Sequence, residues 1–196
     1  MTASVTSPIV ALENVAKRFG EREVFSGFSV ALAPGDVLGV TGPNGSGKTT
    51  LARLLLGLET ADAGVARRVD GARCAAVFQE DRLCMHLSAV ANVRLVVGRH
   101  RGAEEELRAV GVAEDDLHRP VRELSGGQRR RVAIARALAV GADFVVLDEP
   151  LTGIDVDSQA RLIEHIRERL GNAAALVITH EPAALALATR SLTLPA

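Results

Sequence analysis

The chain has 196 residues, of which 47% are hydrophobic and 24% charged, and its formal net charge is -1. These values are typical of one globular domain and exclude a disordered chain. The near-neutral charge gives no reason to expect nucleic acid as a partner, and no segment approaches the ~20 apolar residues of a spanning helix. We therefore expect a cytoplasmic protein whose membrane partner would be another polypeptide.

The first predicted elements are two edge strands. Residues 9–15 and 28–32 alternate apolar and polar side chains on either side of a polar turn at residues 20–23. This alternation is typical of antiparallel strands with one solvated face. Residues 1–10 lack the basic start and apolar segment of a secretory signal.

Four short apolar runs follow, at residues 37–41, 74–78, 144–147 and 175–179. Runs of this kind fill a parallel sheet that is covered on both faces. Helical spacing appears after the first run and again before the third, at Leu51, Leu54, Leu55 and Leu58 and at Val132, Ala135, Leu138 and Ala139. The sequence therefore predicts an α/β fold with a mainly parallel sheet and an antiparallel edge.

A phosphate-binding loop is predicted between the first run and its helix. Gly42-Pro43-Asn44-Gly45-Ser46-Gly47-Lys48-Thr49 fits the pattern G-x-x-x-x-G-K-[ST]. The glycines let backbone N–H groups converge on phosphate oxygens, and the positive end of the following helix adds attraction. We expect Lys48 to reach the β- and γ-phosphates, Thr49 to hold Mg²⁺, and Thr50 to bond nearer the α-phosphate. The alternative is a glycine-rich turn with an incidental lysine. The strand before the motif and the helix after it favour the phosphate-binding loop, because an ordinary turn would not need them.

The strand pattern disappears between residues 79 and 124. Residues 103–110 are typical of an amphipathic helix that ends at Gly111. This region is a candidate helical subdomain inserted in the α/β core.

The only cysteines, Cys74 and Cys84, have no disulfide or metal-ligand spacing, so we expect both to be small buried thiols.

Two acids end the third apolar run. In Phe144-Val145-Val146-Leu147-Asp148-Glu149, the strand delivers Asp148 to the carboxyl edge of the sheet, where it can hold a Mg²⁺-bound water. Glu149, one residue further, can polarise an attacking water. Solvated acids in a turn are the alternative, but the nearby phosphate loop favours the catalytic interpretation.

One pentapeptide points to a family. Leu124-Ser125-Gly126-Gly127-Gln128 precedes a helix that is first basic and then apolar. Here the chain resembles the ABC ATPases, whose signature this is. The resemblance implies ATP bound between two cassettes in a head-to-tail dimer, with Ser125, Gly126, Gly127 and Gln128 contacting the partner's nucleotide. Taken alone, the residues also fit a serine N-cap before flexible glycines.

The resemblance extends over nearly the whole chain. It implies that Phe19 stacks on adenine, although Phe19 could also be an ordinary core residue. It likewise implies a glutamine, Gln79, that reaches Mg²⁺ and the attacking water. Asp155 would act across the dimer interface, and His180 would contact the γ-phosphate. Taken alone, Gln79 would be an ordinary loop residue and His180 a structural one.

The resemblance also implies a domain organisation. We expect one P-loop NTPase domain over residues 1–196, with a RecA-like core and β-subdomain at 1–78 and 141–196 and a helical subdomain at about 79–140. Departures come late, at Ala184-Leu185 and Thr189-Arg190, where many transporter cassettes have acidic residues. We expect no closing strand before Ala196. These departures put in doubt a regulatory role of the C-terminal part of the chain.

A weaker resemblance concerns the type of ABC ATPase. Residues 78–83 and 87–93 are similar to importer cassettes of the nitrate, sulfonate and taurine group. Arg82, Leu83, Met85 and Leu87 would then line a groove for a helix of a transmembrane permease subunit, or would only pack the subdomain. The leading hypothesis is the ATP-hydrolysing subunit of a transporter, which a solute-binding protein would serve in an importer. A soluble ATPase of protein or metal-cluster assembly and a short exporter cassette, such as a haem exporter's, remain alternatives.

Overall fold

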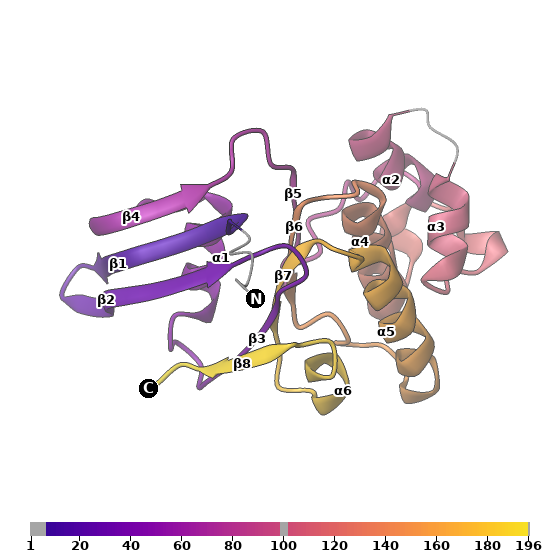
Figure 1. Cartoon of the computed structure of the whole chain (residues 1–196). Helices are drawn as coiled ribbons and strands as arrows, with labels where there is room; N and C mark the ends of the chain where they lie inside the picture. Colours follow the sequence, from indigo (N-terminus) through magenta and orange to yellow (C-terminus); the bar gives the residue numbers. More distant parts are fainter. Residues whose placement is uncertain (1–6, 99–101, 196) are drawn as a thin grey trace.

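A computed structural model describes residues 7–98 and 102–195. Two sheets and a group of helices make up this part of the chain (Figure 1). In chain order the elements are β1 (Val10–Phe19), β2 (Arg22–Leu32), β3 (Val37–Thr41), α1 (Lys48–Leu56), β4 (Ala63–Arg68), β5 (Cys74–Val77), α2 (Ala89–Val97), α3 (Ala103–Ala109), α4 (Gly126–Ala139), β6 (Phe144–Asp148), α5 (Val156–Leu170), β7 (Ala174–Ile178), α6 (Pro182–Leu185) and β8 (Arg190–Thr193). Across the described ranges, no helix has both the length and the apolar character needed to cross a membrane.

The central sheet has five strands in the order β5-β6-β7-β3-β8, and every neighbouring pair is parallel. Its strands β3, β5, β6 and β7 are the four apolar runs that the sequence predicts. Because the strands are parallel, the loops that follow β3, β5, β6 and β7 all leave from the same edge. The predicted α/β fold with a mainly parallel sheet is confirmed, and this edge is where the site lies.

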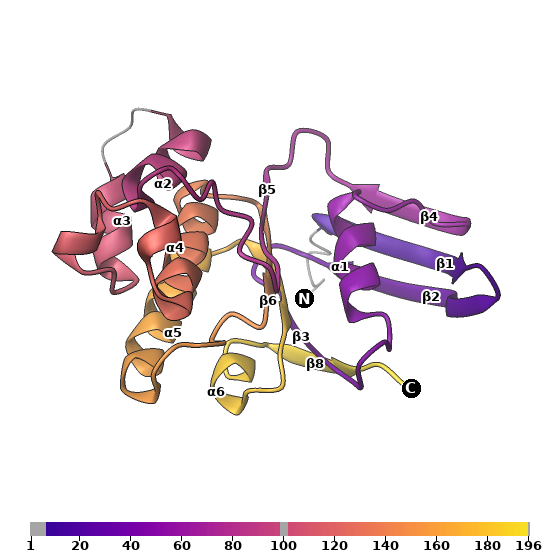
Figure 2. The ribbon, with the colours of Figure 1, turned by 180° about the vertical axis from the view of Figure 1, so that it is seen from behind.

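The two faces of the central sheet bury different side chains. Leu38, Val146 and Leu176 face α1 and the smaller sheet, whereas Val77, Leu147 and Val177 face α4 and α5. Alternate residues of one strand point to opposite faces, so both sets come from the same apolar runs. Figure 2 shows α1 between the central sheet and the smaller sheet, with the remaining helices on the other side.

The smaller sheet has three antiparallel strands in the order β2-β1-β4. A buried ammonium group ties it to the loop after α1: Lys17, only 7% exposed, lies 2.8 Å from Glu59 and 3.3 Å from Asp62. Its Nζ also donates a hydrogen bond to the Thr60 carbonyl at 2.8 Å. The Glu59 carboxylate above all raises the pKa of Lys17, so its charge is retained at neutral pH.

The structure corrects two expectations. A closing strand does exist, because β8 pairs in parallel with β3, from Leu38 opposite Arg190 to Thr41 opposite Thr193. The expectation of two buried thiols is also wrong, since Cys74 is half-buried and Cys84 exposed. Cys84 lies in the loop before α2, where the buried side chain of Asn92 binds its backbone N–H and carbonyl.

Candidate functional site

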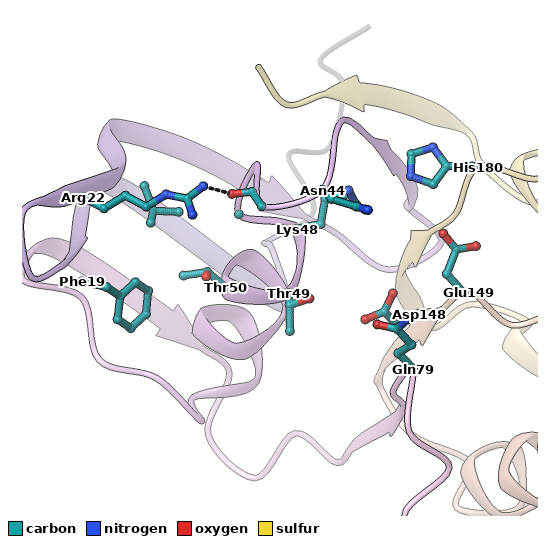
Figure 3. A pocket seen from close by; sticks show the side chains of 13 residues that line it. Phe19, Arg22, Asn44, Lys48, Thr49, Thr50, Gln79, Asp148, Glu149 and His180 are labelled. Atoms are coloured by element: carbon teal, nitrogen blue, oxygen red, sulfur yellow. Dashed lines mark hydrogen bonds between the residues drawn. The ribbon is translucent and has the colours of Figure 1, made fainter. Parts of the chain in front are cut away.

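A cavity of about 620 Å³ lies where the smaller sheet, the phosphate loop and the carboxyl edge of the central sheet meet (Figure 3). Most of its walls come from residues singled out in the sequence. It is lined by Phe19, Arg22, Val24, Asn44, Gly45, Gly47, Lys48, Thr49, Thr50, Gln79, Asp148, Glu149 and His180. The fold therefore brings residues from five separate segments to one place.

The phosphate loop connects β3 to α1. Gly47 has φ of 98°, and a Cβ added there would lie 2.6 Å from the Val24 side chain, so only glycine fits this position. No side chain caps the N-terminus of α1, and its first turn holds no acidic residue. The backbone N–H groups at this helix end consequently remain available to an anion in the cavity.

The lysine of this loop carries an uncompensated charge. Lys48 Nζ donates hydrogen bonds to the carbonyls of Gly42 at 2.5 Å and Pro43 at 2.9 Å. No carboxylate of residues 7–98 or 102–195 forms a salt bridge with it. The cavity lining does not include Gly42, Pro43 or Ser46 of the loop. Ser46 Oγ is buried without a hydrogen-bond partner in the described chain.

An aromatic ring lies at the other end of the cavity. Phe19 is 48% exposed, so the alternative that it is an ordinary core residue is wrong. The Lys17 ammonium lies 5.0 Å from its ring centroid. Arg22 donates a hydrogen bond to the Gly45 carbonyl, which ties β2 to the phosphate loop. A flat, apolar surface is thus available next to a loop built for phosphates.

Asp148 and Glu149 differ in their surroundings. Asp148 is 6% exposed; burial raises the pKa of its carboxyl, Glu149 raises it further, and Arg130 and Lys48 lower it. Glu149 has φ of 48°, a left-handed conformation that costs about 1–2 kcal/mol for a residue with a Cβ. Its backbone N–H donates to the Ile178 carbonyl at 2.7 Å, which fixes this turn to β7.

A buried threonine orients the Glu149 carboxylate. Thr179 Oγ1 donates to Glu149 Oε2 at 2.9 Å and accepts a hydrogen bond from the Glu181 N–H at 3.0 Å. The Glu181 donor occupies one acceptor position of the hydroxyl and leaves its hydrogen for Glu149. One carboxylate oxygen is therefore held, and the other stays free to accept a proton.

The signature residues and Asp155 do not line this cavity. Ser125 and Gln128 form a capping box at the start of α4, with Ser125 Oγ accepting from Gln128 N at 3.2 Å and Gln128 Oε1 accepting from Ser125 N at 2.7 Å. Asp155 caps α5 through Ser158 N at 3.0 Å and pairs with Arg131 at 3.1 Å. The hydrogen bond from Ser158 lowers the pKa of Asp155, so its carboxylate is charged at neutral pH.

The signature loop packs against the loop that follows Glu149. A Cβ on Gly127 would clash with the Gly153 carbonyl oxygen, whereas one on Gly126 would meet nothing within 4 Å. The second signature glycine therefore has a packing role within its own chain. Gly126, the first residue of α4, has no such constraint.

The two glycines give a matched pair of substitutions. We expect Gly127→Ala to lower the free energy of unfolding by about 1–3 kcal/mol, because the loop at Gly153 must move. Gly126→Ala should change it by less than about 0.5 kcal/mol. Urea unfolding followed by circular dichroism measures both, and equal stability of the two variants would contradict the packing role.

The residues after Gln79 were expected either to line a groove for a permease helix or only to pack the helical subdomain, and the structure shows some of each kind. Met85 and Leu87 are exposed, whereas Leu83 packs against the larger apolar core. The Arg82 guanidinium lies 4.3 Å from the Phe78 ring centroid. This surface is therefore partly structural and partly open to a partner.

The residues present fit a nucleoside triphosphate with Mg²⁺. An uncapped helix end, an unpaired lysine and glycines that allow no Cβ suit phosphate oxygens. Mg²⁺ prefers a few protein oxygens together with phosphates, and Thr49, Gln79 and Asp148 line the cavity beside the loop. Burial raises the pKa of Asp148 by disfavouring its charged form, and a cation bound nearby would offset that effect.

Several residues around the cavity escape prediction from the sequence. Arg22 falls in the polar turn predicted at residues 20–23 but begins β2, and Val24 lies in β2 ahead of the strand predicted at residues 28–32. Thr179 ends a buried run and gives no polar pattern. Arg130 lies in a run of three arginines, Arg129 to Arg131, and nothing in the sequence distinguishes it from its neighbours.

Comparisons with known proteins agree with this geometry. Residues 25–152 match a family model described as ABC transporter. The chain is 44% identical, over 193 positions, to an aliphatic sulfonates import ATP-binding protein of Ralstonia nicotianae, covering 91% of this chain and 66% of that protein. It thus spans just under two thirds of the length of that relative.

Two solved structures share the fold. A dimeric bacterial ABC transporter cassette superposes with a TM-score of 0.84 at 24% identity, covering 95% of this chain and 94% of the other. A dimeric post-hydrolysis state of that cassette bound to ADP and Pi gives a TM-score of 0.84 at 26% identity, covering 94% of each chain.

Proposed function

Because this chain belongs to the ABC transporter family, we propose that it is the ATP-binding and ATP-hydrolysing subunit of a transporter. The observation on which this depends is the single cavity that contains the phosphate loop, Asp148, Glu149, Gln79 and His180. Such a cavity holds a triphosphate and also supplies a carboxylate that can accept the proton of the attacking water.

Each wall of the cavity has a role in this proposal. Phe19 stacks on adenine, the residues 42–50 bind the phosphates, and Lys48 neutralises charge on the β- and γ-phosphates. Thr49, Gln79 and Asp148 hold Mg²⁺, which supplies charge neutralisation at the phosphate oxygens. The supporting contacts are those of Lys48 and the burial of Asp148.

Glu149 is the proposed acceptor of the proton of the attacking water. Thr179 holds one of its oxygens at 2.9 Å, so the second oxygen is available in a defined direction. His180 lines the same cavity from the end of β7 and contacts the γ-phosphate in this proposal. The chemistry is in-line transfer of the γ-phosphoryl group to water, in which positioning is the main contribution of the protein.

The active unit is a head-to-tail dimer. Ser125, Gly126, Gly127 and Gln128 do not line the cavity of their own chain; Ser125 caps α4 and the other three form its first turn. In the dimer they contact nucleotide bound by the partner, where the positive helix end faces the γ-phosphate. Asp155 lies at the same interface.

We propose an importer, with transmembrane permease subunits as partners and the chain at the cytoplasmic face of the membrane. Its likeness to a protein named for aliphatic sulfonates import supports that assignment. Exposed Met85 and Leu87 offer apolar surface for a helix of the permease. A solute-binding protein completes the proposed system.

Affinity purification of the tagged chain, after mild detergent extraction of its native host, tests the transport assignment. We expect a multi-span membrane protein in stoichiometric amount, and an accompanying solute-binding protein if the system imports. A membrane partner without any binding protein would favour a short exporter. Recovery with soluble partners alone would favour an ATPase of protein or metal-cluster assembly and overturn the transporter.

A further inference from the structure

One buried guanidinium joins three parts of the proposed site. Arg130, in the second turn of α4, is 3% exposed. A charge in that position is tolerated only with partners, because burying it alone is costly. Its one ionic partner is Asp81, at 3.1 Å, within the chain that the structure describes.

The two terminal nitrogens of Arg130 face different loops. Nη1 donates to the Phe78 carbonyl at 2.5 Å and to Asp81 Oδ1, both in the segment around Gln79. Nη2 donates to the Asp148 carbonyl and, at 2.7 Å, to the Glu149 carbonyl. The planar fork of one side chain therefore connects the loop after β5 to the turn after β6.

These bonds matter most at Glu149. Its backbone is left-handed, with φ of 48°, and is held at both polar groups. The N–H donates to the Ile178 carbonyl of β7, and the carbonyl accepts from Arg130 Nη2 of α4 at 2.7 Å and from the Thr152 N–H at 3.2 Å. A conformation that is unfavourable in isolation persists when its surroundings fix it, and among these three contacts Arg130 provides the one that comes from α4.

The helix that carries Arg130 also carries the signature residues. Ser125 caps α4, and Arg130 follows on the same 14-residue helix. The first turn of α4 is fixed by its capping box, so a displacement of the whole helix would carry both positions. A displacement of the signature end must therefore shift the guanidinium and the carbonyls bonded to it.

We propose that Arg130 is a positioning residue for Glu149, making the placement of this carboxylate depend on the orientation of the signature helix. The inference rests on the proposed ATPase function and adds a residue to it. Arg130 does not line the cavity, so it would not contact a nucleotide bound there. It acts through the turn that it holds.

The test compares Arg130→Met with the wild-type chain, both purified in full length. Methionine retains the unbranched stem as far as the position of Nε and loses every donor, so we expect kcat to fall at least about 10-fold while the Kd for MgATP stays within about 2-fold. Arg130→Lys retains the charge, but its single nitrogen cannot serve both loops, so we expect an intermediate kcat.

A control removes an arginine of α5 that is bonded to α4 outside the site. Arg169 donates to the Leu138 carbonyl at 3.2 Å and contacts Glu106 at 3.1 Å, away from Asp148 and Glu149. Arg169→Met should leave kcat within about 2-fold of wild type even if it lowers the melting temperature. Equal losses in the two methionine variants would show a general structural role and overturn the proposal.

A double substitution separates positioning from stability. If Arg130 acts through Glu149, adding Arg130→Met to Glu149→Gln should change the remaining single-turnover rate by less than about 2-fold. A further loss as large as in the wild-type background would overturn the inference. If the methionine variants aggregate, Arg130→Lys is measured in both backgrounds against the same criterion.

The wild-type rate separates the two proposals. A wild-type chain that binds MgATP without hydrolysing it, alone and with its membrane partner, would overturn the ATPase assignment and this inference with it. Hydrolysis by the wild type together with wild-type kcat in Arg130→Met and Arg130→Lys would overturn the inference alone.

Discussion

Replacing Lys48 with alanine is expected to abolish ATP hydrolysis. Among residues 7–98 and 102–195, its ammonium is bonded only to the carbonyls of Gly42 and Pro43, so its full charge is available to phosphate oxygens. Loss of a charged donor at phosphates costs at least about 100-fold in kcat/KM, and binding weakens in parallel. Phosphate release and titration with a fluorescent ATP analogue measure the two effects.

The fold should survive this substitution, because Lys48 starts α1 and alanine is a good helix former. The control is therefore an unchanged thermal unfolding curve measured without nucleotide. Wild-type ATPase activity in Lys48→Ala would exclude the phosphate loop as the site of ATP binding.

Replacing Glu149 with glutamine is expected to trap a dimer on MgATP. Glutamine has the same shape and its carbonyl oxygen still accepts the hydrogen bond of Thr179, so the cavity is preserved. It cannot accept a proton, and we expect kcat to fall by about 10²–10⁴-fold. Closure survives while hydrolysis does not, so the closed dimer accumulates.

Light scattering after size exclusion measures this outcome at saturating MgATP. The variant should elute as a dimer with nucleotide and as a monomer without it. The double variant Lys48→Ala, Glu149→Gln should remain monomeric in both conditions, because it lacks the bound nucleotide that joins the two copies. A Glu149→Gln monomer at saturating MgATP would argue strongly against a shared interface site.

The parts of the fold that the sequence predicts are those with a strong local pattern. The runs that became β3, β5, β6 and β7 are continuous and apolar because both faces of the sheet are covered. Strand β4 has no alternation of buried and exposed residues that could predict it, because all its residues are exposed. It is defined by its antiparallel pairing with β1, which is distant in the sequence. Strand β8 was missed for a similar reason: only Leu192 among its residues is not exposed.

The candidate site divides in the same way. Residues of the phosphate loop and the acids after β6 follow from local spacing, and the structure places them around one cavity. Arg130 depends on carbonyls 52 and 18 residues away, at Phe78 and Asp148, which no local pattern specifies. The packing of Gly127 against Gly153 likewise appears only when two distant loops meet.

The buried cluster around Lys17 has a practical consequence for chemical labelling. Lys17 and Lys48 are the only lysines of the chain. Because Lys17 is enclosed by Glu59 and Asp62 and its pKa is raised, it is a poor nucleophile towards amine-selective reagents. Acylation of a lysine in the folded protein therefore reports on Lys48. Its suppression by a ligand gives a direct footprint of occupancy at the phosphate loop, without any engineered tag.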